Sequence, residues 1–277
     1  MSTRFLIILA TAASLGGCST AESSKSKKIS PTKPAKNAKT QPVAKAKPTQ
    51  KGERKVALVE LFTSQGCSSC PPADRLLSRV NKAVDDVEVI PLAFHVDYWN
   101  YIGWKDPFSN AKWSARQRQY AQRLNRGSSY TPQLVINGKS HAVGSNRGAV
   151  FEQIREHALS GKDLISVDKA VVGAESVSFK IDVSKAASLK AEPSIVVAVY
   201  ENDLVTKIKR GENTGRTLTN DFVVRDTAQV KLTPSKDSYR LKIPVQSAWK
   251  KKNLGAVVFM RTATGEVLST IKVPVRS

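Results

Sequence analysis

The sequence predicts an α/β domain built on a mixed sheet, followed by an all-β domain. Three observations lead to this prediction. At residues 60–74 an apolar run ends in a polar turn, and a Cys-x-x-Cys sequence then opens a helical pattern. A second apolar run follows that helix, and the strand–helix–strand order favours parallel pairing. Beyond Gly161, short alternating runs separated by turn residues replace the helical patterns.

The first residues, 1–17, have the features of a bacterial lipoprotein signal peptide. Arg4 supplies a basic start, a short apolar stretch follows, and a sequence resembling a lipobox ends at Cys18. This stretch is too short for a comfortable transmembrane span. We expect cleavage before Cys18 and attachment of lipid, including palmitate, to that residue. The protein would then be anchored in the cell envelope facing the periplasm, and Ser19 favours the outer membrane.

Residues 18–54 are rich in lysine, proline and alanine and contain almost no large apolar side chains. Such a segment cannot bury enough surface to offset the entropy lost on ordering, so we expect a disordered tether. Its lysines contribute to a formal net charge of +21 and could attract anionic envelope polymers or lipid headgroups. The alternative is a solvated spacer. No aromatic residues are interleaved with the lysines, so we expect no nucleic-acid partner.

The α/β domain is expected to span residues 55–162, with a helical insertion at about 97–127. Asn137-Gly138 predicts a tight hairpin turn between two short strands. The insertion is dense in aromatic residues, and its helix would begin after Ser109 and carry Arg116 on its solvent-facing side. The expected strands are 56–63, 87–96, 133–136 and 141–144, and the expected helices are 74–84, 109–125 and 149–159.

Residues 163–277 are expected to form an all-β domain, sandwich-like in architecture. The segment 209–218 is polar, basic and contains glycine. It could contact an anion or a peptide, or it could be an ordinary hairpin loop. The expected strands are 165–172, 176–183, 194–200, 222–224, 229–232, 239–245, 255–261 and 267–273.

Cys67 and Cys70 are the candidate reactive residues, because lipidation of Cys18 would leave them as the remaining thiols of the mature chain. The positive end of the following helix would stabilise a thiolate at Cys67. Cys67 would therefore be the nucleophile, with its sulfur facing solvent, and Cys70 would be the more buried resolving thiol. The alternatives are a static disulfide and half of a zinc site.

The Cys-Ser-Ser-Cys sequence at 67–70, together with Thr131-Pro132, resembles the active centre and the cis-proline loop of the thioredoxin superfamily. The resemblance implies a thioredoxin-like fold for the α/β domain. It also implies a cis Thr131–Pro132 bond lying against the disulfide, with the Thr131 backbone offered to a substrate chain. Cis bonds are otherwise a minority, roughly 5–6% of X–Pro bonds in folded proteins.

From about residue 55 onward, the chain also resembles an uncharacterised family of secreted bacterial thioredoxin-like proteins, which is defined by a domain of unknown function. This resemblance covers both expected domains and is specific for family membership. The matching runs are 60–74, 95–108 and 209–218.

Three further residues are candidates for the site. Glu60 lies in an apolar strand and could accept the proton of Cys70 if it is buried, although an outward-facing or salt-bridged Glu60 is equally compatible. His95 closes the second strand, where it could be a structural residue or a metal ligand. Trp99 could line a peptide groove or pack the insertion.

Three functional hypotheses follow. The first is a thiol–disulfide oxidoreductase that acts on exported proteins, works with an unknown redox partner and needs no cofactor. The second is a copper-binding chaperone or insertase that uses Cys67, Cys70 and His95. The third is a non-catalytic envelope-binding protein with an inert disulfide.

Overall fold

The computed structural model describes residues 55–80, 84, 86–125, 127–160, 164–184 and 193–276, except for the side chains of Lys169 and Arg276. The expected signal peptide, the lipidation site Cys18 and the expected tether lie outside the described residues. The elements are β1 (Lys55–Thr63), α1 (Pro71–Val80), β2 (Val87–His95), η1 (Asn100–Ile102), α2 (Ala111–Leu124), β3 (Gln133–Ile136), β4 (Ser140–Val143), α3 (Arg147–His157), β5 (Leu159–Ser160), β6 (Ile165–Val172), β7 (Ser176–Val183), β8 (Ser194–Glu201), β9 (Leu204–Lys207), β10 (Thr217–Asn220), β11 (Val223–Lys231), β12 (Ser238–Pro244), η3 (Lys251–Asn253), β13 (Leu254–Arg261), β14 (Val267–Val273) and β15 (Val275–Arg276).

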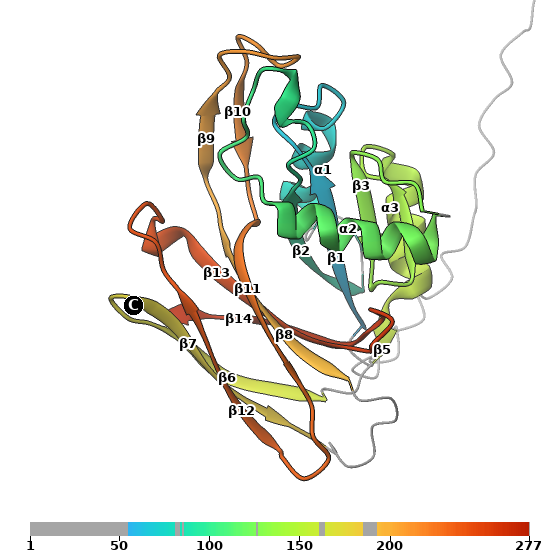
Figure 1. Ribbon diagram of the computed structural model, residues 1–277. Helices are drawn as coiled ribbons and strands as arrows, with labels where there is room; N and C mark the ends of the chain where they lie inside the picture. The colour runs from blue at the N-terminus through green and yellow to red at the C-terminus, as the bar shows by residue number, and fades with distance from the viewer. Residues whose placement is uncertain are drawn as a thin grey trace, which may run out of the picture. The chain divides into compact units, whose positions relative to one another are not determined.

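The main sheet has nine strands in the order β14-β13-β8-β11-β2-β1-β3-β4, with β5 pairing with β1 (Figure 1). β1 and β2 are parallel, and α1 makes the connection between them. β3 and β4 form the hairpin expected from Asn137-Gly138, and both turn residues have positive φ. The sheet is therefore mixed, as the sequence predicts.

Side chains along β1 alternate between two helices. Glu60 and Phe62 contact Tyr120 of α2, whereas Thr63 contacts α1. Because successive side chains of a strand point to opposite faces, α1 and α2 lie on opposite faces of the sheet. This alternation determines which polar groups of β1 can reach the cysteines.

A four-stranded sheet in the order β12-β7-β6-β15 packs against the other half of the main sheet (Figure 1). The core between them combines Phe179 and Ile243 of the small sheet with Val197 and Val258 of the main sheet. The main sheet runs across the expected boundary at 162/163, because β8, β11, β13 and β14 join strands of the first half. The two halves of the chain thus share one sheet.

Several expected element boundaries are corrected. α1 begins at Pro71 rather than at residue 74, since proline fits the first turn of a helix. The N-cap of α2 is Asn110, whose side chain accepts a bond from the amide of Lys112, and not Ser109. The two strands expected at 222–224 and 229–232 are one strand, β11, whose bulged and polar middle conceals its continuity in the sequence.

The hairpin of β9 and β10 was not expected as a pair of strands. It leaves the main sheet between β8 and β11 and lies beside α1 (Figure 1). Its loop contains most of the polar segment 209–218. None of the described helices is long and apolar enough to cross a membrane.

Asn137 connects three parts of the fold at the β3–β4 turn. Its Oδ1 accepts a bond of 2.7 Å from the amide of Leu58, and its Nδ2 donates a bond of 2.7 Å to the carbonyl of His157. The residue is 1% exposed, so these bonds have no replacement from solvent. Its backbone carbonyl also accepts a bond from Val267 of β14.

We predict that Asn137→Ala lowers the free energy of unfolding by about 2–4 kcal/mol, because it leaves the buried Leu58 amide without a partner. Urea denaturation measures this loss. Asn146→Ala removes only the exposed cap of α3 and serves as the comparison, with an expected loss of about 1 kcal/mol. Equal losses for the two variants would contradict the role assigned to Asn137.

Candidate functional site

Cys67 and Cys70 form a disulfide in the turn between β1 and α1, with their Cα atoms 5.4 Å apart. Both residues are 0% exposed. The expectation that the Cys67 sulfur faces solvent is therefore wrong. Side chains from distant segments bond to the Cys67 sulfur and backbone, and only Ser68 and Ser69 of the motif are exposed.

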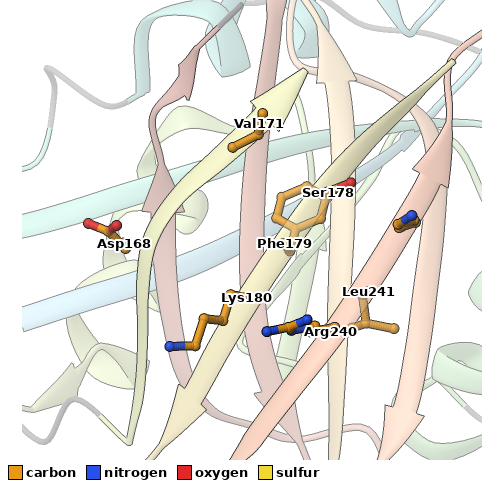
Figure 2. Close-up of a pocket in the computed structure, with 8 residues that line it drawn as sticks. Asp168, Val171, Ser178, Phe179, Lys180, Arg240 and Leu241 are labelled. Atoms are coloured by element: carbon orange, nitrogen blue, oxygen red, sulfur yellow. The ribbon is translucent and has the colours of Figure 1, made fainter. Parts of the chain in front are cut away.

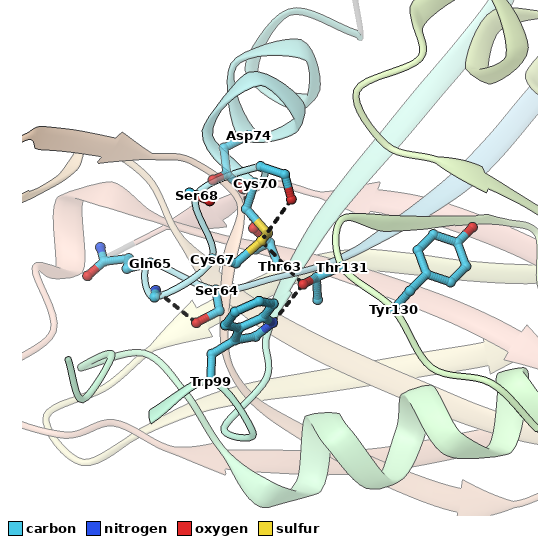
Figure 3. The surroundings of a disulfide bond; sticks show 12 residues. Thr63, Ser64, Gln65, Cys67, Ser68, Cys70, Asp74, Trp99, Tyr130 and Thr131 are labelled. Atoms are coloured by element: carbon cyan, nitrogen blue, oxygen red, sulfur yellow. Dashed lines mark hydrogen bonds between the residues drawn. A yellow bond between two sulfur atoms is a disulfide. The ribbon is translucent and has the colours of Figure 1, made fainter. Parts of the chain in front are cut away.

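Two hydroxyl groups contact the Cys67 sulfur (Figure 3). Thr131 Oγ1 donates to it at 3.3 Å, and Ser69 Oγ lies at the same distance of 3.3 Å. The Nε1 of Trp99 donates to Thr131 Oγ1 at 2.7 Å, which fixes the position of that hydroxyl. Hydrogen bonds to a sulfur favour its charged form, so these hydroxyls would stabilise a Cys67 thiolate after reduction.

The Thr131–Pro132 bond is cis, as the resemblance to the thioredoxin cis-proline loop implies. The carbonyl of Pro132 accepts a bond from the amide of Gly144. A Cβ at Gly144 would come within 2.7 Å of Leu61 and 3.2 Å of Ala73, so a glycine is needed for this close approach. Pro132 thus lies close to the first turn of α1, and the residue before it, Thr131, bonds to the Cys67 sulfur.

The loop of the β9–β10 hairpin closes over the Cys-x-x-Cys turn. Asn213 Nδ2 donates to the carbonyls of Gln65 and Cys67 at 2.9 and 3.0 Å, and the Asn213 residue is 0% exposed. Glu212 Oε2 accepts a bond of 2.9 Å from the amide of Ser68. The segment 209–218 is therefore more than a plain hairpin loop, because it holds the turn that carries Cys67.

A buried carboxyl group lies one helical turn after Cys70. Asp74 Oδ1 accepts a bond of 2.8 Å from Thr63 Oγ1, and Asp74 is 8% exposed. Burial raises the pKa of Asp74 to about 6, which outweighs the opposing effects of His95 and Thr63. Asp74 can therefore hold or release a proton near neutral pH beside the disulfide.

Glu60 is buried, one of the two possibilities that the sequence left open, but both oxygens of its carboxylate are already hydrogen-bonded. Arg116 Nε donates to its Oε2 at 2.6 Å, and the Tyr120 hydroxyl donates to its Oε1 at 2.7 Å. Both partners belong to α2, on the face of the sheet opposite α1. We therefore correct two expectations: Glu60 is not placed to accept the proton of Cys70, and Arg116 is not a solvent-facing residue.

His95 forms a buried pair with Asp106, with 2.7 Å between Nδ1 and Oδ2, and both side chains are 0% exposed. Burial opposes the charged ring, but the Asp106 carboxylate outweighs it and raises the pKa of His95. Asp106 also accepts a bond from the amide of Gln65, so the pair supports the turn before Cys67. The other ring nitrogen of His95 is buried and has no hydrogen-bond partner among the described residues.

The metal hypothesis gains no support from this arrangement. In the part of the chain that the structure describes, no group of three or more His, Cys, Asp or Glu side chains is placed to hold a metal ion. His95, Cys67 and Cys70 therefore form no such group in this structure. The Nδ1 atom of His95 is already bonded to Asp106.

A hollow lies away from the disulfide, on the outer face of the four-stranded sheet (Figure 2). It has a volume of about 400 Å³ and is lined by Val171 and by the cations Lys180 and Arg240, among others. Lys180 and Arg240 are cross-strand neighbours in β7 and β12. No nucleophilic pair or buried acid is among its lining residues, so this hollow is not the candidate redox site.

Residues 58–261 match a family described as "Protein of unknown function (DUF1223)". This range is more than half of the chain. The chain belongs to the DUF1223 family. The family match includes the disulfide, the cis-proline loop and the capping hairpin, so the DUF1223 region contains every part of the site.

Two solved structures are similar to this DUF1223 protein. Protein AGR_C_4864 from Agrobacterium tumefaciens is 28% identical, with a TM-score of 0.58, over 81% of this chain and 96% of that one. HBP35 of Porphyromonas gingivalis is 14% identical, with a TM-score of 0.58, over 80% of this chain and 76% of that one. The second likeness concerns the fold alone. A comparison with curated proteins found no significant match.

Three residues of the DUF1223 site were not predicted from the sequence: Asp74, Asp106 and Asn213. Asp74 had a usable signal, because it lies three residues before Leu77 and therefore falls on the buried side of the helix. Asp106 and Asn213 had no local signal. Asn213 is 146 residues from Cys67 along the chain, and nothing in a single sequence places the two together.

We predict that Asp74→Asn stabilises the protein above about pH 6 but not near pH 4. A pKa raised from 3.8 to about 6 means that the native state favours the protonated carboxyl. The stability from this group is present below pH 3.8 and is lost as the pH rises through about 6. The advantage of the uncharged Asn should therefore grow to at most about 3 kcal/mol.

Urea denaturation of the oxidised protein across this pH range measures the difference. The exposed Asp237→Asn is the matched control, and its stability curve should run parallel to that of the unsubstituted protein. A parallel curve for Asp74→Asn as well would contradict the raised pKa.

We also predict that Asn213→Ala increases the rate at which dithiothreitol reduces the Cys67–Cys70 disulfide, by about tenfold. Loss of the two bonds to the turn lowers the free energy of opening the loop by roughly 1–2 kcal/mol. Thr214→Ala is the control, since the Thr214 hydroxyl bonds only within the loop, to Gly211. An unchanged rate for Asn213→Ala would show that the hairpin does not limit access.

Proposed function

We propose that the protein is a thiol–disulfide oxidoreductase whose α/β half is a thioredoxin-like domain. The observation that carries the proposal is the pairing of Cys67 and Cys70 at the start of α1, with Thr131 bonded to the Cys67 sulfur next to a cis Thr131–Pro132 bond. A dithiol at a helix start is chemically asymmetric when, among the described residues, hydroxyls bond to the Cys67 sulfur and none to that of Cys70. That asymmetry suits one sulfur for attack and the other for resolution.

In the oxidised protein, a substrate thiolate attacks the Cys67 sulfur. A substrate–Cys67 disulfide forms, the Cys67–Cys70 bond breaks, and Cys70 leaves as a thiolate that takes up one proton. The second thiolate of the substrate then attacks the substrate sulfur of the mixed disulfide. A disulfide forms within the substrate, and Cys67 leaves as a thiolate. Two electrons pass from the substrate dithiol to the protein, and the reverse sequence reduces a substrate disulfide.

Asp74 is the proposed proton donor and acceptor for Cys70. Its pKa of about 6 provides both a protonated and an ionised fraction near neutral pH. Asp74 follows Cys70 by one turn of α1, and the amide of Asp74 bonds to the carbonyl of Cys70. His95 and Thr63 affect the pKa of Asp74, so they act as positioning residues rather than as catalytic ones.

We place this activity in the bacterial envelope, on exported proteins. The proposal rests on the lipobox-like sequence ending at Cys18 and on the basic segment 18–54 that would tether the domain to a membrane. A periplasm-facing location would expose the dithiol to an oxidising compartment, where substrates with thiols and disulfides occur.

A second candidate function is a non-catalytic one with a structural disulfide. The complete burial of Cys67 and Cys70 favours it, because a substrate reaches neither sulfur unless the surrounding loops move. The two candidates differ in how the disulfide responds to a thiol substrate.

We predict that the protein catalyses reduction of insulin by dithiothreitol, and that Cys67→Ser abolishes the activity. Cys70→Ser should instead accumulate a mixed disulfide at Cys67, which mass spectrometry detects, because the resolving thiol is missing. Asp74→Asn should lower the turnover rate by about 100-fold, a usual contribution of general acid–base catalysis. Asp237→Asn should leave it unchanged.

A different set of results would favour the structural disulfide. If the unsubstituted protein accelerates no exchange and its disulfide stays intact in strong reductant while the protein is folded, the disulfide is structural. A fully active Cys67→Ser variant would also overturn the mechanism.

A further inference from the structure

A basic groove runs along α1, beginning beside the disulfide. One hollow of about 600 Å³ is lined by Ser68 together with Arg75 and Arg216. A second hollow, of about 350 Å³, is lined by Arg75, Arg79 and Arg147 among others. Arg75 and Pro72 line both hollows, so the two are adjacent. We call this surface the arginine groove.

The four arginines of the groove are exposed and lack acidic partners within the described residues. Arg216 donates a bond of 2.9 Å to Asn213 Oδ1, and the Arg147 guanidinium lies 5.1 Å from the Phe151 ring centroid. The carboxylate of Glu212 is bonded to the amide of Ser68, at one end of the groove. The groove therefore has an excess of positive charge.

The stability of the fold explains this arrangement only in part: the dipole of α1 favours Arg79 in its last turn, and Arg147 contacts the Phe151 ring. Arg75 and Arg79 are four residues apart on one helix, where like charges repel and destabilise the helix. Arg147 is the first residue of α3, where the helix dipole disfavours a cation. By contrast, the buried Arg116 is paired with Glu60, and the partly buried Arg225 is paired with Glu201.

We propose that the arginine groove binds an acidic segment of the substrate protein, next to the cysteine that reacts with Cys67. The proposal rests on the thiol–disulfide function proposed above, and it specifies the substrate class of that site. The groove begins at Ser68, which follows Cys67 directly. A substrate segment bound in the groove would therefore place the adjoining residues of the substrate next to Cys67. Guanidinium groups bind carboxylates through paired hydrogen bonds, which makes them suited to Asp and Glu side chains.

The spacing of the arginines fits an extended peptide. Arg75 and Arg79 are separated by about 6 Å along the helix axis. Side chains on the same side of an extended chain repeat every two residues, or roughly 7 Å. Acidic residues at alternate positions of the substrate would therefore meet successive arginines of α1.

Arg216 also connects the groove to the loop that covers the disulfide. Its guanidinium bonds to Asn213, and Asn213 bonds to the carbonyls of Gln65 and Cys67. A substrate carboxylate that binds Arg216 competes with Asn213 for the guanidinium. Binding in the groove thus weakens the bond within the loop that orients Asn213 toward the turn.

The test compares three peptides with the same two cysteines, followed at alternate positions by Glu, Gln or Lys. The full-length oxidised protein should react with the Glu peptide about tenfold faster than with the Gln peptide, and most slowly with the Lys peptide. High salt should remove the difference, because exposed charges are screened. Arg75→Gln/Arg79→Gln should reduce the preference to about twofold or less.

Lys180→Gln/Arg240→Gln is the matched control, since it removes two cations from the outer face of the other sheet and should keep the preference. Equal rates for the three peptides would overturn the proposal while leaving the thiol–disulfide function intact. If no peptide reacts at all, the proposed function itself fails.

Binding without chemistry provides a separate measurement. The Cys67→Ser/Cys70→Ser variant should bind a fluorescent cysteine-free Glu peptide more tightly than the Gln peptide, and Arg75→Gln/Arg79→Gln introduced into this background should remove the difference. Failure of the Glu peptide to bind would overturn the proposal. So would binding of anionic phosphatidylglycerol vesicles through Arg75 and Arg79 in place of the peptide, because the groove would then be a membrane contact.

Discussion

The alternation of side chains along β1 determines how the site is built. β1 is buried on both faces, so its successive side chains point alternately into the layers on the two sides of the sheet. Glu60 and Phe62 belong to the α2 layer, while Leu61 and Thr63 belong to the α1 layer, where the disulfide lies. Glu60 is therefore neutralised by its ion pair with Arg116 and lies on the face of the sheet opposite the disulfide. The acid that shares the α1 layer with the disulfide is Asp74, which is why the proposed proton-accepting role is assigned to it.

The elements with strong local signals could be predicted from the sequence. The apolar run of β2, the Asn137-Gly138 hairpin and most strands of the second half follow from hydrophobic period and turn chemistry. The role of Glu60 could not be predicted, because burial alone does not say which face a residue of a doubly buried strand occupies. The hairpin over Cys67 could not be predicted either, since its contacts join segments far apart in the chain.

The shared sheet explains why a domain boundary drawn from sequence texture was misleading. Helical patterns do end near residue 160, and strands dominate the described residues beyond it. Yet β11 pairs with β2, where the amide of Ala93 donates to the carbonyl of Phe222, so the later strands extend the earlier sheet. Composition changes mark a change in local structure, whereas hydrogen bonding between strands decides which segments form one unit.

The distance along the chain between the disulfide and its cover has a consequence for biosynthesis. Asn213 follows Cys67 by 146 residues, which a ribosome adds in about 7–30 s. Until then the two sulfurs belong to an incomplete chain that has no cover over them. The order of synthesis therefore sets an interval during which the nascent thiols are open to reagents that the finished protein excludes.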